Sequence, residues 1–141
     1  MSPVDLFWDR CEGSIRFGVN DCCMVVADVV LTAGGPDLMA GYRGRYRTAR
    51  GFVRAFRREG HKTLHAACEA AFSANGRLVY DPVNFDVAVV EHFELTTNKT
   101  MSSPAVFIGG SWLFRTDRGG AAILPAAFRQ NPTIFRLPIR A

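Results

Sequence analysis

The segment from Phe17 to Val30 constrains the fold most, because it reads as a helix that begins at a cysteine. Asn20 or Asp21 can serve as its N-cap, since either side chain can accept a hydrogen bond from a free backbone N–H of the first turn. Apolar residues then recur at helical spacing and form one stripe: Cys22, Val25, Val26, Val29, Val30 and Ala33. Two glycines and Pro36 follow and end the helix. We therefore expect a central helix packed on the core, with Cys22 in its first turn.

The predicted place of Cys22 suits a nucleophile. Unpaired N–H groups and the helix dipole favour a thiolate at a helix N-terminus. A cysteine there needs a general base within hydrogen-bond reach. Cys11, Cys23 and Cys68 are interpreted as small core residues instead. The four cysteines contain no Cys-x-x-Cys pair and no Cys/His spacing typical of zinc, so we expect no metal, no cofactor and no disulfide framework.

Length and charge set the broad class. The 141 residues suit one domain, with a helical part over about 1–76 and a sheet part over about 77–141. The formal charge of +4 permits an anionic partner without requiring one. No apolar run approaches the roughly 20 residues that span a bilayer. The first ten residues lack the basic start and apolar core of a secretory signal.

The order of the predicted elements indicates an α+β fold. Besides the central helix, the periodicity predicts helices over 3–11, 48–59 and 63–74. Strands are predicted over 78–80, 85–93, 105–108, 112–115, 121–124 and 133–137, as an antiparallel meander. Residues 94–103 read as a long hairpin loop, and residues 125–128 as one helical turn.

Three short motifs occur in a fixed order along the chain. Asp21-Cys22-Cys23-Met24 follows the approach Ile15-Arg16-Phe17-Gly18, then come Phe85-Asp86-Val87 and Ser103-Pro104-Ala105-Val106-Phe107-Ile108-Gly109. This order resembles the papain-like cysteine peptidases of bacterial cell walls, the NlpC type. Their helix begins Asp-Cys-Ser-Gly after a Tyr-x-Trp-Gly-like approach. A Gly-Asp-Val or Gly-Asp-Leu strand and a His-x-Gly-Ile-Tyr-x-Gly strand follow. The resemblance implies a papain-like fold with helices packed on an antiparallel meander.

The chain looks more specifically like a small, divergent phage and prophage branch of that superfamily. The Asp21-Cys22 helix, the segment Tyr42-Arg43-Gly44-Arg45-Tyr46 and the final meander carry this likeness. Members are encoded near tail genes. The resemblance therefore implies a tail-tip protein of the virion, made in the host cytoplasm. Its implied partners are other tail-tip proteins, such as the hub and the distal tail protein, and peptidoglycan.

Three departures from the family pattern fall at the implied catalytic site. Ser103 stands where the family has its catalytic histidine, and serine is not a base near neutral pH. Ile15 replaces the approach tyrosine and cannot hydrogen-bond an oxyanion. Met24 replaces a small glycine and is expected to crowd Cys22. These departures favour a degenerate, structural protein over an active enzyme.

His92 is the one candidate for a migrated base. It lies near the end of one predicted strand, and Ser103 begins the next, so the two positions are neighbours in an antiparallel hairpin. The alternative is an exposed hairpin residue between Glu91 and Glu94. Asp21 likewise has two interpretations, a residue that orients the substrate beside the cysteine or a plain helix cap. The candidate catalytic residues are therefore Cys22, His92, Asp21 and Ser103.

Two functions fit this pattern, a structural tail-tip component and an active peptidase or amidase with Cys22 as its nucleophile. A third feature is a run of arginines interleaved with aromatic residues: Arg43, Arg45, Arg47, Arg50, Arg54, Arg57 and Arg58. Phe52 and Phe56 lie at helical spacing and are expected in the core. The arginines are interpreted as a solvated face or a docking patch for an acidic protein, and nucleic acid is not an expected partner.

Overall fold

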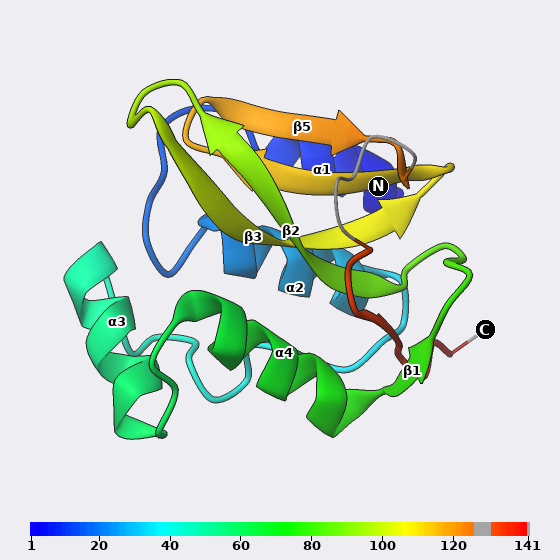
Figure 1. Ribbon diagram of the computed structural model, residues 1–141, viewed down its shortest axis with the longest axis horizontal. Helices are drawn as coiled ribbons and strands as arrows, with labels where there is room; N and C mark the ends of the chain where they lie inside the picture. The colour runs from blue at the N-terminus through cyan, green and yellow to red at the C-terminus, as the bar shows by residue number, and fades with distance from the viewer. Residues whose placement is uncertain (126–130, 141) are drawn as a thin grey trace.

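The computed structural model describes residues 1–125 and 131–140. Within them, four helices precede a six-stranded antiparallel sheet (Figure 1). The helices are α1 (Pro3–Arg10), α2 (Cys22–Thr32), α3 (Ala49–Arg58) and α4 (Leu64–Asn75). The strands are β1 (Arg77–Val79), β2 (Val87–Glu94), β3 (Lys99–Ile108), β4 (Ser111–Thr116), β5 (Gly119–Ile123) and β6 (Ile134–Arg136). The α+β class is confirmed. The helical turn expected over 125–128 lies largely outside the described residues.

Helix α2 begins at Cys22, as the sequence predicts, and Asp21 is its N-cap. The Asp21 carboxylate accepts hydrogen bonds from the backbone N–H groups of Cys23 and Met24, both at 3.1 Å. Most of the helix is buried, because its apolar residues face both the sheet and the other helices. It ends where the Gly35 N–H bonds back to the Val30 carbonyl at 2.9 Å.

The hairpin of β2 and β3 is longer than the sequence indicates. Residues 94–103 do not form a loop, because pairing continues to Glu94 opposite Lys99. Opposite charges at that last pair and Phe93 opposite Thr100 favour continued pairing. The turn is confined to residues 95–98, where Asn98 takes a positive φ of 54°. The hairpin carries Ser103 and His92 on adjacent strands.

The sheet is not a simple meander. Its strand order is β1-β6-β2-β3-β4-β5, so β6 lies between β1 and β2 and pairs with both. The ion pair of Asp86 with Arg136 fixes this junction, with Nε–Oδ1 and Nη2–Oδ2 distances of 3.1 and 3.0 Å. The Asp86 carboxylate also accepts from the Val83 N–H at 2.9 Å, so Asp86 bonds a turn at the start of the strand.

The two faces of the sheet carry separate apolar clusters, since side chains alternate along a strand. Val87, Val89, Val106 and Leu113 pack with the helices. The opposite face holds a second cluster: Ala88, Val90, Ala105, Phe107, Trp112, Phe114 and Ile134. In Figure 1, α2 and α4 lie together along one side of the sheet.

No described helix is both long and apolar enough to cross a bilayer.

Candidate functional site

The start of α2 is held by a dense set of hydrogen bonds to Asp21. This carboxylate is 2% exposed. Besides its two bonds within α2, its Oδ2 accepts from the Gly18 N–H and from the Tyr46 hydroxyl, each at 2.7 Å. Burial and this carboxylate raise the pKa of Tyr46 well above its usual value, so the hydroxyl stays protonated and donates. Asp21 therefore locks α2 to the approach segment and to the loop before α3.

Gly18 makes this arrangement possible. It has a φ of 86°, which side chains rarely adopt, and a Cβ there would lie 2.5 Å from the Tyr46 carbonyl oxygen. Because the backbone passes so close to Tyr46, the Gly18 N–H reaches Asp21. The glycine before the Asp-Cys pair is thus explained by packing.

Cys22 is half-buried, whereas Cys11, Cys23 and Cys68 are buried, as the sequence indicates for the latter three. All four are free thiols. The Cys22 and Cys23 sulfurs are 4.0 Å apart, and the Cys23 and Cys68 sulfurs are 3.7 Å apart. Hydrogen bonds to these two neighbouring thiols, together with burial, raise the pKa of Cys23 well above its usual value. Cys23 is therefore an inert thiol.

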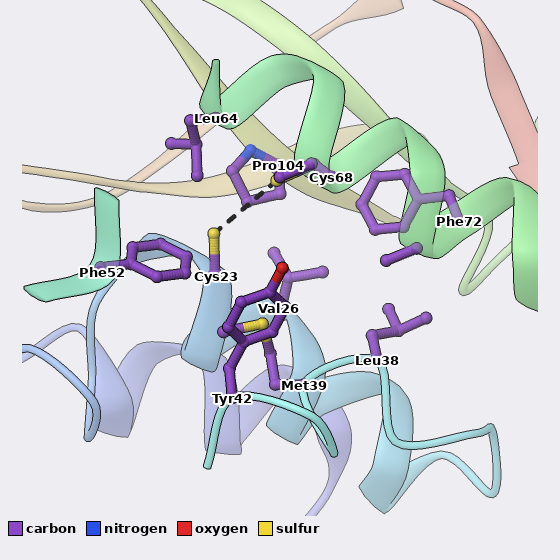
Figure 2. A pocket seen from close by; sticks show the side chains of 12 residues that line it. Cys23, Val26, Leu38, Met39, Tyr42, Phe52, Leu64, Cys68, Phe72 and Pro104 are labelled. Carbon is purple, nitrogen blue, oxygen red and sulfur yellow. Dashed lines mark hydrogen bonds between the residues drawn. The ribbon is translucent and has the colours of Figure 1, made fainter. Parts of the chain in front are cut away.

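An apolar pocket lies beside Cys23 and Cys68. Figure 2 shows side chains from α2, α3, α4, the 38–42 loop and β3 facing into it. The space that the centre of a water molecule can occupy is about 30 Å³. That is room for a small group such as a branched aliphatic side chain or two waters. Its walls offer few polar partners, so an apolar occupant is favoured. The lining residues include Val26, Leu38, Met39, Tyr42, Phe52, Leu64, Phe72 and Pro104.

His92 and Ser103 are brought together, as the hairpin argument predicts. The His92 Nε2 and the Ser103 Oγ are 2.8 Å apart. His92 lies two residues after Val90, and Ser103 lies two residues before Ala105, so each side chain is on the same face of the sheet as the second cluster. The His92 ring also contacts Phe114, with ring centroids 4.7 Å apart. They therefore face away from α2.

This orientation separates the candidate base from the candidate nucleophile. Cys22 packs with the cluster on the helix side of the sheet. On β3 the side chain that faces the helices next to Cys23 and Cys68 is Pro104, which has no proton to exchange. Within the described residues no imidazole hydrogen-bonds to the Cys22 sulfur. The four predicted site residues thus form two separate pairs, Asp21 with Cys22 and His92 with Ser103.

Two carboxylates complete the surroundings of His92. Glu94 Oε1 lies 3.2 Å from His92 Nδ1. Burial, and then the neighbouring Asp117, raise the pKa of Glu94 to about 7. The hydrogen bond from Glu94 lowers the pKa of Asp117, so Asp117 is ionised in the range where Glu94 gains or loses its proton. Burial lowers the pKa of His92, with Asp117 opposing. The sequence did not indicate that Asp117 interacts with Glu94, because only folding brings the two carboxyl groups together.

The basic run divides into paired and unpaired arginines. Arg43 bonds Asp28 and Asp37, with Nη2–Oδ1 and Nε–Oδ2 distances of 2.8 Å in both cases. Phe52 and Phe56 are buried, which confirms their place in the core; the Phe52 ring stacks on Tyr46 and meets the Phe56 ring edge-on. No group of three or more His, Cys, Asp or Glu side chains among the described residues could hold a metal ion.

Comparison with known families gives one match. A family model described as a domain of unknown function (DUF6950) matches residues 9–136. The chain belongs to the DUF6950 family. The matched region includes the Asp21-Cys22 helix, the arginine run and all six strands. No curated protein and no solved structure matches the chain.

Proposed function

We propose that this DUF6950 chain is a structural component of a phage tail tip, built on a degenerate papain-like, NlpC-type peptidase fold. It binds neighbouring tail proteins, such as the hub and the distal tail protein, or contacts the host wall. It is made in the host cytoplasm and ends up in the tail of the virion. The resemblance of its three motifs to that superfamily supports the ancestry, and a helix that begins at a cysteine and packs on an antiparallel sheet is compatible with it.

The observation that carries the structural role is the orientation of Ser103. At the position where the resemblance puts the catalytic base, the side chain is a serine and points away from α2, bonded to His92. Among the described residues the only side chain bonded to the Cys22 sulfur is the Cys23 thiol, and a thiol without a base is a poor nucleophile near neutral pH. The Asp21 carboxylate does not serve as this base, because it already accepts hydrogen bonds from four donors.

An active peptidase or amidase that cuts peptidoglycan during entry is the second candidate. One observation favours it: Cys22 is half-buried, whereas the other three cysteines are buried. In that case Cys22 attacks a peptide carbonyl while a partner protein supplies the base.

Virion incorporation and peptidoglycan cleavage together separate the two functions. Wild-type protein and Cys22→Ala are compared by zymography on peptidoglycan and by their recovery in assembled tails. For the structural role we expect both proteins in tails and no clearing band from either. Clearing by wild type that Cys22→Ala abolishes establishes the enzyme instead. Absence of the chain from purified virions contradicts the structural proposal.

A further inference from the structure

Helix α3 presents a face made only of arginines. Arg50, Arg54, Arg57 and Arg58 are all exposed. Among the described residues none of them makes an ion pair or a side-chain hydrogen bond, and the same holds for Arg45 and Arg47 in the preceding loop. Buried or structural arginines elsewhere behave differently. Arg115, for example, donates to the carbonyls of Arg10 and Gly13 at 3.0 and 2.7 Å. We call the four residues of α3 the arginine face.

The positive charge of the chain is concentrated here. Residues 43–62 hold seven arginines and one lysine against one glutamate, a formal charge of +7. The whole chain carries +4, so the remaining residues together carry −3. The single glutamate, Glu59, accepts a hydrogen bond from the Tyr42 hydroxyl at 2.8 Å, and among the described residues it makes no ion pair with the arginine face. A field this localised attracts an anionic partner to one end of the molecule.

The geometry of α3 makes the face continuous. Phe52 and Phe56 fix the inner side of the helix against Tyr42 and Tyr46. At 3.6 residues per turn, the four arginines lie on the opposite side, in a strip about 12 Å long. Figure 1 shows α3 at one end of the long axis, beyond the edge of the sheet.

The chemistry of the face favours carboxylates of a protein. A guanidinium forks two hydrogen bonds onto one carboxylate, and arginine is enriched at protein interfaces whereas lysine is depleted. Single-stranded nucleic acid binding needs exposed aromatic rings on which bases stack. Here Tyr46, Phe52 and Phe56 are buried. The same burial leaves α3 without an apolar side to insert into a lipid surface.

We infer that the arginine face of α3 is a docking surface for an acidic surface of another protein. The inference deepens the structural role proposed above, because it names the kind of partner and the helix that receives it. It rests on that role only for the identity of the partner as a tail protein.

Binding of the full chain to poly-L-glutamate tests the face directly. The variant R50Q/R54Q/R57Q removes three charges from α3. The matched control R16Q/R77Q/R140Q removes three charges from exposed arginines elsewhere, whose side chains make no described bond. At about 0.15 M salt we expect the α3 variant to weaken the affinity about tenfold or more, and the control less than about threefold. Circular dichroism confirms that both variants are folded.

Two further probes decide between partner classes. A double-stranded DNA oligonucleotide and vesicles of phosphatidylglycerol with phosphatidylcholine are measured against the same three proteins. Tighter binding of either probe than of poly-L-glutamate, lost in the α3 variant, overturns the inference in favour of nucleic acid or lipid. Equal weakening in both triple variants, or no binding of poly-L-glutamate, also overturns it. Because this assay needs no virion, it can fail while the chain is still recovered in tails.

Discussion

Two buried carboxylates near the candidate residues have opposite surroundings. Asp21 accepts four hydrogen bonds, which tie the start of α2 to Gly18 and Tyr46. Glu94 lies instead beside Asp117 in a buried position, and its pKa rises to about 7. At the residue scale, the first carboxylate holds a helix in place, whereas we expect the second to make the stability of the fold depend on pH.

Glu94→Gln should remove the pH dependence that Glu94 gives to the free energy of unfolding. The pKa of Glu94 is about 7 in the fold and 4.5 ordinarily, so its stabilising contribution is complete below about pH 4.5 and is lost as pH rises through about 7. We expect the unfolding free energy of the variant relative to wild type to rise by about 1–3 kcal/mol between about pH 5 and pH 8. Urea denaturation at both pH values measures this difference.

His92 acts in the opposite direction. Its pKa lies below the ordinary 6.5, so its contribution to stability is lost as pH falls. Glu91→Gln is the matched control, because Glu91 is an exposed residue of the same strand. A constant difference between Glu94→Gln and wild type across this pH range contradicts the assigned role of Glu94.

At the scale of elements, β6 is the strand that joins β1 to the rest of the sheet. It pairs with β1, which directly follows α4, and with β2. Where α4 ends, a Cβ on Gly76 would lie 2.6 Å from the Arg136 carbonyl oxygen. Gly76 has an ordinary extended backbone, with a φ of −151°. Close contact with the strand, and not backbone conformation, therefore requires the glycine.

Gly76→Ala should push β6 away from α4. We expect a loss of about 1–3 kcal/mol in the free energy of unfolding, typical of an added methyl in a tightly packed site. Gly41→Ala is the control, because the nearest atom to a Cβ there is 4.0 Å away. It should change the stability by less than about 0.5 kcal/mol. Thermal denaturation compares the two, and similar melting temperatures would show that β6 yields to the methyl group.

The helices could be predicted because their signals are local. Asp21, Thr48 and Thr63 each cap the helix that follows, and the apolar spacing gives the buried side. The place of β6 could not be predicted, because it depends on pairing with residues about fifty positions earlier. The face of the sheet on which the Ser103 side chain lies could not be predicted for a different reason. Alternation shows that Ser103 and Ala105 share a face, but not which face the helices cover.

At the scale of the whole molecule, the packed core decides which thiols can react. Three cysteines lie inside it and Cys22 at its edge. Burial raises the pKa of Cys11 to about 11, and Cys23 is shifted upward as well. Both effects leave little thiolate at neutral pH.

Titration with an aromatic disulfide reagent should therefore find one fast thiol. We expect Cys22 to react in the native protein, at least about tenfold faster than the other three. Guanidinium chloride should make all four equally reactive, since unfolding removes the burial. Cys22→Ser should abolish the fast phase and leave the total in denaturant one lower. A fast phase that persists in Cys22→Ser would mean that the core opens around another cysteine.

The position of β6 between β1 and β2 also has a consequence for synthesis on the ribosome. Among the strands of the described residues, β1 pairs only with β6, although about fifty-five residues separate them. Until residues 134–136 leave the exit tunnel, β1 and the adjoining edge of β2 have unpaired backbone groups. The β2–β5 hairpins can form earlier, because their contacts are local. Nascent chains stalled before residue 134 should thus stay protease-sensitive at β1, and the pairing of β6 should be the last step in the assembly of the sheet.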